Sequence, residues 1–357
     1  MPPTSLLHRC AALLAVTLLL ALPARLAADL VWTPAGGWKI EGGVTSGLSG
    51  EEAHNALTLM NKARASEENR SYFFALSRYK KVTKLYPNSI YAPEAYYHIG
   101  TIRLARHQYL KAFKAFQEVV SRYPNTARFN EVVGRQFRIA CDLLDGARNH
   151  SWFFGLGFRN REASVGMFEL VVSNAPYGEY APVALMSIAK AHQHLKNPEQ
   201  SIDALDRMIN TYPKSVLTPD AYLRSAQAYA SMVEGPSYDQ TSTKEAITYF
   251  EDFVILFPGD TNISGAEKGL ADMKVVLAES KLKTGDYYLK YRRNYKAAKV
   301  FYNEAITDYP DSKVAVHARA DLTKVDALLA EQEKAAAGAA GQPVPPKPSK
   351  KKRFLFF

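Results

Sequence analysis

Cysteine is nearly absent from this chain, which has two among its 357 residues. Cys10 lies in an N-terminal segment that has the pattern of a signal peptide, so Cys141 would be the single cysteine of the mature chain. A single cysteine excludes an intramolecular disulfide. Because Cys141 falls on an expected helical face, we expect it to be an inert core thiol.

Long hydrophobic runs are missing too, apart from one near the N-terminus. Ala11 to Leu22 is apolar except for Thr17, follows Arg9, and precedes Pro23 and the small residues Ala27-Ala28. The run is shorter than the roughly 20 apolar residues of a membrane span, and its flanks are typical of a secretory signal. We expect a signal peptide at 1–28 and an exported chain, with an uncleaved anchor as the alternative.

The folded body lacks a strong charge of either sign. The formal net charge is +10, but two of these charges lie in the expected signal and five in the C-terminal tail, which leaves +3 for residues 29–335. Nucleic-acid binding depends on a basic surface, and a body this close to neutral gives it little support. We therefore expect no nucleic-acid partner.

The tail, residues 335–357, is rich in Ala, Gly, Pro and Lys and ends in aromatics. Its last eight residues are Lys350-Lys351-Lys352-Arg353-Phe354-Leu355-Phe356-Phe357. This composition is typical of a disordered segment. Three interpretations stay open: peripheral contact with an anionic membrane, a peptide ligand for a partner protein, and a solvated tail with no partner.

Motifs that carry catalysis are absent. His192 and His194 are two positions apart, so on one helix they point in different directions and do not chelate one metal. Gly155-Leu156-Gly157 follows no predicted strand and is not a nucleotide-binding loop. No nucleophile motif is present. We expect a non-enzymatic binding protein with no cofactor, no metal site and no small-molecule substrate.

The sequence does contain a pattern that occurs twice, 37 positions apart. Each copy has apolar residues three or four apart, as on one face of an α-helix, and then a Tyr-Pro step whose proline ends the helix. The Asn-Ser or Asn-Thr that follows suits a turn and the cap of the next helix. The copies are Tyr72, Ala75, Tyr79, Val82 with Tyr86-Pro87-Asn88-Ser89, and Tyr109, Ala112, Phe116, Val119 with Tyr123-Pro124-Asn125-Thr126.

A second helical pattern lies between the two copies. Its apolar and small residues are Ala92, Ala95, Tyr96, Ile99, Gly100 and Leu104. Gly100 has no side chain, so a neighbouring helix can approach it closely. One unit is then two antiparallel helices, near the period of helix-turn-helix arrays. Such a unit cannot bury its apolar faces alone, so several must stack.

The step ending in proline recurs six times and sets the number of units. Insertions near 150–158 and 234–238, and a long helix at about 265–283, explain the intervals longer than 37. We predict an all-α domain at 51–334 with about six helix pairs, closed by a capping helix from about Asp311 to Lys334. The six steps are Tyr86-Pro87, Tyr123-Pro124, Ala175-Pro176, Tyr212-Pro213, Phe257-Pro258 and Tyr309-Pro310.

Residues 29–50 form a Trp/Gly-rich N-terminal arm that differs from the rest. Trp32 and Trp38 flank a Pro/Gly turn that includes Pro34 and Gly36. We expect a short hairpin, or an extended arm, packed on the first repeat.

The first helix of each pair is expected to line a concave binding surface. The third pair has two alignments, on Gly134 or Phe137, and both leave three arginines near the groove. These arginines could clamp carboxylates of an extended peptide; solvated helix faces are the alternative. The expected surface residues are Glu94, Tyr97, Thr101 and Ala105 in the second pair, Arg128, Arg135 and Arg138 in the third, and Met186, Lys190 and Gln193 in the fourth.

The repeat resembles the tetratricopeptide repeat, because Ala112, Phe116 and Pro124 follow the small residue Gly100 at 12, 16 and 24 positions. The resemblance implies a right-handed superhelix of the six helix pairs.

A more specific likeness covers roughly residues 51–330. It resembles the BamD family of repeat lipoproteins, which belong to the machine that assembles β-barrels in the outer membrane. Family members usually carry a lipidated cysteine after the signal, whereas no cysteine lies near residue 28 here, and one or two extra units precede the Tyr287-Tyr288 motif. The matching stretches are Gly285-Asp286-Tyr287-Tyr288-Leu289-Lys290, Asn294-Tyr295-Lys296-Ala297-Ala298, Asp308-Tyr309-Pro310-Asp311-Ser312, Trp152-Phe153-Phe154-Gly155 and Tyr86-Pro87-Asn88-Ser89.

This resemblance implies a periplasmic scaffold that takes part in inserting β-barrel proteins into the outer membrane. Its expected partners are a barrel-forming assembly subunit and unfolded barrel clients. One alternative is a periplasmic repeat adaptor for cell-wall or envelope maintenance. Another is an enzyme accessory or hydrolase, which would need a polar cleft with a strongly perturbed carboxylate or histidine.

Overall fold

The computed structural model describes residues 29–33, 37–41, 50–150 and 157–340. The predicted signal peptide and the tail beyond residue 340 lie outside the described residues, and so does the stretch Trp152-Phe153-Phe154-Gly155-Leu156 of the first insertion. The chain divides into two compact units, Met1–Ala191 and His192–Phe357, and each is described by itself.

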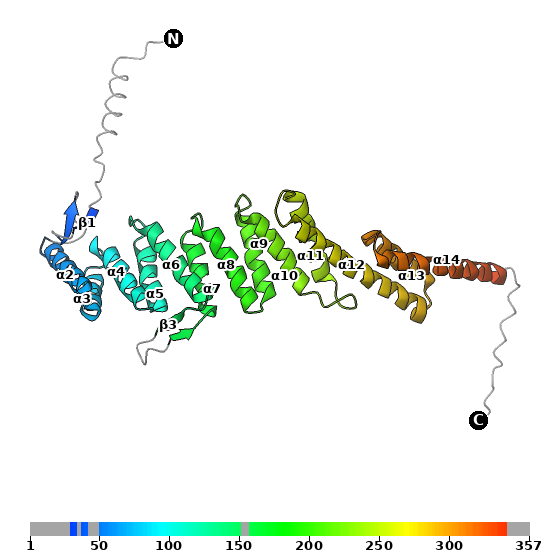
Figure 1. Ribbon diagram of the computed structural model, residues 1–357, viewed down its shortest axis with the longest axis horizontal. Helices are drawn as coiled ribbons and strands as arrows, with labels where there is room; N and C mark the ends of the chain where they lie inside the picture. Colours follow the sequence, from blue (N-terminus) through cyan, green and yellow to red (C-terminus); the bar gives the residue numbers. More distant parts are fainter. Residues whose placement is uncertain (1–28, 34–36, 42–49, 151–156, 341–357) are drawn as a thin grey trace, which may run out of the picture. The chain divides into compact units, whose positions relative to one another are not determined.

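The first unit begins with a strand hairpin and continues as helices that pack in chain order (Figure 1). A second, shorter hairpin lies between α6 and α7. The last helix that begins in this unit is α8, which extends three residues past the division. The elements are β1 (Asp29–Thr33), β2 (Gly37–Glu41), α2 (Gly50–Glu68), α3 (Tyr72–Leu85), α4 (Tyr91–Ala105), α5 (Tyr109–Arg122), α6 (Phe129–Leu144), β3 (Arg148–His150), β4 (Gly157–Arg159), α7 (Glu162–Asn174) and α8 (Tyr180–His194).

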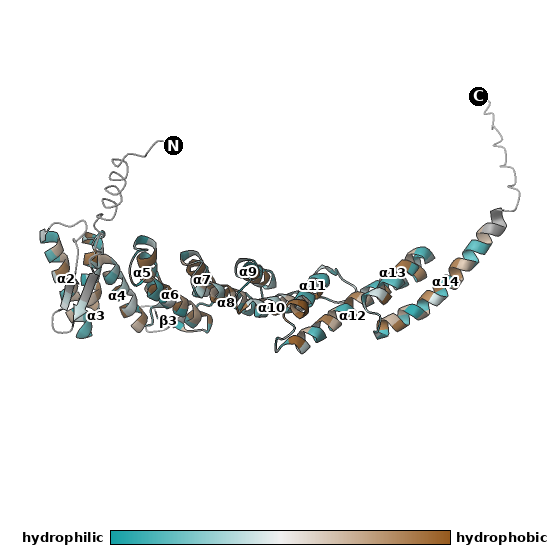
Figure 2. Ribbon diagram, turned by 90° about the horizontal axis from the view of Figure 1, so that it is seen from above, coloured by the Kyte–Doolittle hydropathy of each residue, from teal (hydrophilic) through white to brown (hydrophobic). Residues whose placement is uncertain are grey.

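The second unit is helical throughout its described part, and each helix packs on the next. Hydrophobic and hydrophilic residues alternate in bands along α13 and α14 (Figure 2), as expected for helices with one buried face. The elements are α9 (Pro198–Thr211), α10 (Thr218–Ser231), α11 (Thr241–Leu256), α12 (Ile263–Tyr287), the π-helical turn η1 (Tyr288–Arg292), α13 (Tyr295–Asp308) and α14 (Lys313–Ala340).

The predicted helix ends are confirmed. Each second helix of a pair (α3, α5, α7, α9, α11 and α13) ends two residues before its proline. At the first of them the amide of Tyr86 still donates to the carbonyl of Val82 at 2.9 Å, and the chain then turns at Pro87. The described helices therefore follow the predicted order of six pairs and a final helix, in an all-α tetratricopeptide-repeat fold.

The small and aromatic residues of the repeat pack against one another as predicted. Phe116 and Tyr302 are fully buried, and Phe250 is nearly so. In the second pair a Cβ on Gly100 would stand 2.5 Å from the ring of Phe116, and in the sixth a Cβ on Gly285 would stand 2.6 Å from Tyr302. These glycines are required because the ring occupies the space of a side chain.

The predicted cap after the proline is wrong in both copies: in the second copy the N-cap of α6 is Arg128, and no side chain caps that helix. The residue at the N-cap of α4 is Ile90, and no side chain caps the helix. The hydroxyl of Ser89 instead donates to the carbonyl of Tyr86 at 2.7 Å, and so closes the turn that precedes the helix. A hydroxyl that donates backward in this way satisfies a carbonyl at the end of α3.

The N-terminal arm is a hairpin packed on the first repeat, as one of the two expectations had it. Trp32 and Trp38 are direct partners across β1 and β2. Trp38 is buried in a core cluster with Met60, and its amide donates to Asn61 Oδ1 at 2.7 Å. The Arg64 guanidinium lies 4.3 Å from the centre of the Trp32 ring. The hairpin is thus part of the core of the first unit.

Part of the stretch that carries the family likeness, from Gly285 to Asn294, forms the connection between α12 and α13. The π-helical turn at 288–292 interrupts the step from α12 to α13, and Arg293 after it has φ +49°. Asp286 accepts from Tyr302 Oη and Lys290 Nζ, both at 2.7 Å. Asn294 caps α13 through the Ala297 amide. These residues join α12 to α13.

The last helix is longer than predicted. It continues through Ala340, although we placed the start of the tail at residue 335. The added residues, Ala335 to Ala340, are almost all alanine, which has the highest helix propensity, and this outweighed the single Gly338. Among the described residues, no helix combines the length and the apolar character needed to cross a membrane.

Candidate functional site

Four of the predicted surface residues meet between α4 and α6 in the first unit. Tyr97 lies at the centre: its hydroxyl donates to Glu131 Oε1 and accepts from Arg135 Nη2 at 2.7 Å. Arg128 donates to Glu94 Oε1 at 2.5 Å and to Glu131 Oε2 at 2.9 Å. We call these five residues, Glu94, Tyr97, Arg128, Glu131 and Arg135, the arginine–tyrosine cluster.

The two arginines also use the ring of Tyr97. The guanidinium carbons of Arg128 and Arg135 lie 4.4 and 5.1 Å from the ring centre. A cation over the face of an aromatic ring is attracted by the negative charge of the ring face. Carboxylates and an aromatic ring therefore both hold the two arginines of the cluster in place.

Electrostatics in the cluster favour the charged forms of Glu131 and Arg128. Burial would raise the pKa of Glu131, but hydrogen bonds from Tyr97, Arg135 and Arg128 outweigh it and lower that pKa. Burial would lower the pKa of Arg128, yet the hydrogen bonds and charges of Glu94 and Glu131 raise it. Burial raises the pKa of Tyr97, and the bond to Glu131 raises it further, so Tyr97 stays a neutral donor.

A buried histidine connects this cluster with the N-terminal hairpin. His98 is buried and stacks on the ring of Tyr79 with ring centres 5.1 Å apart, and the Trp38 ring meets its edge at 5.8 Å. Its Nδ1 lies 3.0 Å from Glu67 Oε2, and its Nε2 lies 4.0 Å from Glu94 Oε2. His98 thus lies between the cluster and the core of the first repeat.

Arg138 lies next to the cluster but does not join it. With Arg135 it lines a cavity of about 400 Å³ whose other walls include His107, Cys141 and Asp142. Burial, together with the charges of Asp145 and Asp142, raises the pKa of the Cys141 thiol to about 11. A thiol with so high a pKa is rarely ionised near neutral pH, which agrees with the expected low reactivity, but Cys141 is half-buried in the wall of the cavity and is not the core residue that was predicted.

The other predicted residues are placed elsewhere. Thr101 uses its hydroxyl on the carbonyl of His98 at 3.0 Å. Met186 is buried with 9% of its surface exposed, so its side chain offers little area to a partner. Lys190 is half-exposed with Nζ 3.7 Å from Asp145 Oδ1. These three residues are not brought together with the arginine–tyrosine cluster.

Sequence reasoning missed Glu131 and His98. Glu131 stands three positions after Arg128 and four before Arg135, the spacing at which side chains on one helix face meet, so the pairing was visible in the sequence. His98 stands four positions after Glu94 on α4, but its closer partners Glu67 and Tyr79 come from other helices, so spacing along one helix did not reveal them. Of the two alignments of the third pair, Phe137 is the residue that packs on the second-helix ring of Phe168, at 5.7 Å.

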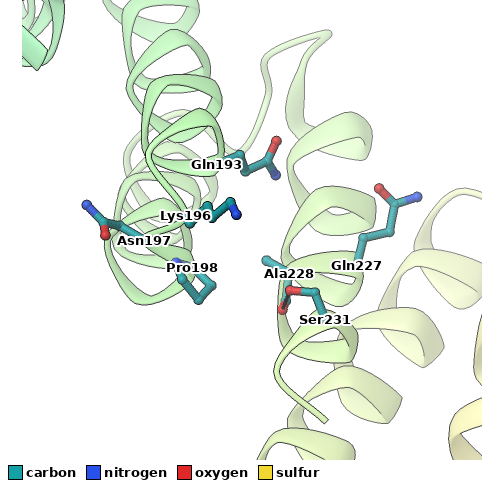
Figure 3. Close-up of a pocket in the computed structure, with 7 residues that line it drawn as sticks. All are labelled: Gln193, Lys196, Asn197, Pro198, Gln227, Ala228 and Ser231. Carbon is teal, nitrogen blue, oxygen red and sulfur yellow. Dashed lines mark hydrogen bonds between the residues drawn. The ribbon is translucent and has the colours of Figure 1, made fainter. Parts of the chain in front are cut away.

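A second cavity lies within the second unit, between the turn into α9 and the helix α10 (Figure 3). It has a volume of about 430 Å³ and is lined by Gln193, Lys196, Asn197, Pro198, Gln227, Ala228 and Ser231. Gln193 and Lys196 point toward α10, whereas Asn197 points away (Figure 3). Gln193 and Gln227 present amides that can both donate and accept, which suits contact with a peptide backbone.

The polar groups of the arginine–tyrosine cluster are bonded to one another. The cluster pairs its acids with arginines, and its hydroxyl is a neutral phenol with a raised pKa. In the part of the chain that the structure describes, no three His, Cys, Asp or Glu side chains are placed to hold a metal ion. The chemistry on offer is recognition of carboxylates and of backbone amides.

Comparison with known families gives two matches. Residues 159–337, half of the chain, match the YfiO family, which is described as outer membrane lipoprotein. Residues 94–126 match the tetratricopeptide repeat. The second match covers α4 and α5, the helices of the repeat that contributes Tyr97.

One curated relative is the outer membrane protein assembly factor BamD of Rickettsia prowazekii (strain Madrid E). It is 26% identical over 143 residues, which are 40% of this chain and 57% of the relative. The chain thus spans little more than half the length of the relative that it matches.

Solved structures with a similar arrangement have low sequence identity. A tetratricopeptide repeat protein from Parabacteroides merdae is 12% identical with a TM-score of 0.30, over 76% of this chain and 99% of that one. PilF of Pseudomonas aeruginosa is 11% identical with a TM-score of 0.28, over the same shares.

Proposed function

The chain belongs to the YfiO family of outer membrane lipoproteins, and from this membership we propose that it is a non-enzymatic scaffold in the assembly of β-barrel proteins into the outer membrane. The observation that carries the proposal is the match over residues 159–337, together with the likeness to an assembly factor. The scaffold works at the periplasmic face of the outer membrane. It binds a barrel-forming assembly subunit and unfolded barrel clients.

The arginine–tyrosine cluster supplies a recognition chemistry that supports this role. Arg128 and Arg135 are about one-third exposed, and Glu131 is 40% exposed, so the cluster can be reached from solvent. An extended segment of a partner that carries a carboxylate takes the place of Glu131 on one or both guanidinium groups. Because the arginines already lie over the Tyr97 ring, little side-chain entropy is lost when the carboxylates exchange.

The test is a pull-down from envelope membranes in a mild detergent, with an affinity tag inserted after Ala340, where α14 ends. We expect an outer-membrane β-barrel protein that carries periplasmic domains to be recovered with the chain. Recovery of cell-wall enzymes without any barrel protein contradicts the assembly role and favours an envelope-maintenance adaptor.

The role of the cluster is tested by R128A/R135A in the same pull-down. Removal of the clamp should reduce recovery of the barrel protein at least tenfold, because each charged hydrogen bond to a carboxylate contributes about 1.5–3 kcal/mol. The matched control is Arg224→Ala in α10. Arg224 also bonds an acid on its own helix, Asp220 at 2.8 Å, with a side-chain exposure of 37% against 36% for Arg128. Equal losses in both variants would remove the cluster from the proposal.

A further inference from the structure

A basic segment lies in the first unit, although the body of the chain is nearly neutral. Residues 70–117 contain nine Lys and Arg side chains and one acid, Glu94. The segment therefore carries a charge of +8 within a body that sums to +3, so the remainder of residues 29–335 is acidic at −5. The helix α3 (Tyr72–Leu85) has four cations and no acid.

The cations of this segment have no ion-pair partners among the described residues, unlike the arginines on either side. Arg64 pairs with Glu67, Arg122 pairs with Glu118, and Arg128 pairs with Glu94 and Glu131. No lysine or arginine between residues 70 and 117 is in an ion pair in the described part of the chain. Of these cations, only the guanidinium of Arg78 is hydrogen-bonded among the described residues: it donates to the hydroxyl of Ser66 and to the carbonyl of Lys62, both on α2.

The unpaired cations lie close enough together to repel one another. Burial, and then the charges of Arg103 and Lys111, lower the pKa of Lys80. Burial and the charge of Arg106 lower the pKa of Arg103. These groups come from α3, from α4 and its end, and from α5, so they form one positive surface across three helices. An anionic ligand would relieve this repulsion.

Two exposed aromatic rings lie at one end of the same surface. Phe73 is 67% exposed and Phe74 is 57% exposed, and the two rings meet edge to face at 5.6 Å. With Arg70, Tyr72 and Arg106 they line a shallow depression of about 370 Å³. We call this surface the basic–aromatic patch; it consists of Arg70, Phe73, Phe74, Lys80, Arg103, Arg106 and Lys111.

We propose that the basic–aromatic patch docks the chain on an anionic phospholipid surface. Exposed rings enter the boundary between headgroups and acyl chains, while long cationic side chains reach the phosphates around them. The charge of +8 complements a negatively charged leaflet, which attracts each nearby cation. An acidic protein is the other class of partner, but the patch spreads its cations over three helices and presents two rings side by side at its edge. That arrangement suits a flat interface.

This proposal goes beyond the scaffold role and does not depend on it. It concerns α3, α4 and α5, whereas the family match lies at residues 159–337. Binding to lipid without a barrel partner would support lipid docking alone. Binding to a barrel partner without lipid would support the scaffold role alone.

The first experiment is co-sedimentation of residues 29–357 with vesicles of phosphatidylcholine alone or with about one-third phosphatidylglycerol. We expect binding to the anionic vesicles that weakens as salt is raised. F73S/F74S should weaken it about tenfold or more, and K80Q/R106Q roughly fivefold per charge removed. The control Y177S/V216S removes apolar side chains that are 97% and 93% exposed, and K214Q/K268Q removes exposed cations elsewhere. Equal binding by patch and control variants overturns the proposal.

The C-terminal tail is itself basic and aromatic, so a probe on the patch is needed to locate the contact. Ser77 is exposed, one turn beyond Phe73 on α3. In a Cys141→Ser background, an environment-sensitive fluorophore on Ser77→Cys should brighten and shift to shorter wavelength with anionic vesicles. The same label on Ser264→Cys, at an exposed position of α12, should not change. A silent label on Ser77→Cys while the chain sediments with vesicles would place the contact elsewhere and overturn the proposal.

Discussion

The ring edge of Phe116 lies 2.5 Å from the point at which a Cβ on Gly100 would stand. Phe116 is fully buried, so neither the ring nor the backbone of α4 has room to retreat without moving a neighbour. The same relation recurs between Gly285 and Tyr302 at 2.6 Å, so close approach of a glycine and a ring joins the helices of the second and the sixth pair.

We predict that Gly100→Ala destabilises the chain by about 1–3 kcal/mol, although alanine is the better helix former by about 1 kcal/mol. The free energy of unfolding from urea titration measures the effect. Gly166→Ala in α7 is the matched control, because nothing lies within 4 Å of its added Cβ. That control should be neutral or slightly stabilising, and equal effects at the two glycines would contradict the packing argument.

Phe116→Ala should lower the free energy of unfolding by about 3–5 kcal/mol, as loss of a buried aromatic does. The physical reason is the cavity left between α5, which carries this ring, and α4, which packs on it. Phe73→Ala provides the comparison, since that ring is 67% exposed and its loss should cost well under 1 kcal/mol. A melting temperature unchanged in Phe116→Ala would show that the two helices do not pack as described.

The parts of the fold that follow from local chemistry could be predicted from the sequence. Proline is tolerated in the first turn of a helix but not in its interior, so the ends of α3 and α5 can be predicted from Pro87 and Pro124, which follow a full helical pattern. Burial of Phe116 followed from its spacing along a helix. The extension of α14 to Ala340 is equally local, because the helix propensity of alanine extends the helix up to the Pro-rich residues further along.

Other features depend on distant partners, and the sequence did not reveal them. The β3–β4 hairpin consists of Arg148, Asn149 and His150 against residues 157–159, with no alternation of apolar and polar side chains. It is held in part by the His150 amide, which donates to the carbonyl of His107 at 2.9 Å. The pairing of Arg128 with Glu94 likewise joins successive repeats. The sequence predicts that both residues line the groove, but it does not predict the contact between them.

The N-terminal hairpin should be required for stability of the first unit. Trp38→Ala removes a ring that is 4% exposed and packs with the α2 core, so we expect a loss of about 3–5 kcal/mol. Asn61→Ala, which removes the acceptor of the Trp38 amide, should cost about 1–2 kcal/mol. Both values come from denaturant titration. A loss of stability in Trp38→Ala that is no larger than the loss in Asn61→Ala would contradict the packing of the Trp38 ring in the core.

Glu67 should stabilise the first unit at neutral pH and lose this effect in acid. Burial would raise its pKa, but hydrogen bonds from His98 and Tyr79 and the charges of His98 and Arg64 lower it below the usual 4.5. A carboxylate whose folded-state pKa is lowered stabilises the fold above its unfolded pKa, and the stabilisation disappears as pH falls through the folded value. Glu67→Gln should therefore cost about 1–3 kcal/mol at pH 7 and progressively less below about pH 4.5.

The neighbour Glu68 is the control for this prediction. It pairs with Arg64 at 3.3 Å, but its side chain is 49% exposed, against 18% for Glu67. Exposed pairs contribute little, so Glu68→Gln should change the free energy of unfolding by well under 1 kcal/mol at any pH. A cost for Glu67→Gln that stays constant between pH 7 and pH 3 would mean that the charge of Glu67 is not what stabilises the unit.

Glu131 should compete with a partner for the arginines of the cluster. Its carboxylate accepts from Arg128 at 2.9 Å and from Arg135 at 3.0 Å, so a partner carboxylate must displace it. Glu131→Gln keeps the shape and the acceptor oxygen but removes the charge. The variant should therefore retain the barrel partner several-fold better in the pull-down, and the advantage should shrink at high salt, which screens the incoming charge. The control Glu162→Gln, an exposed acid of α7, should leave retention unchanged. Weaker retention in Glu131→Gln than in the control would mean that Glu131 positions the arginines for the partner rather than occupying their site.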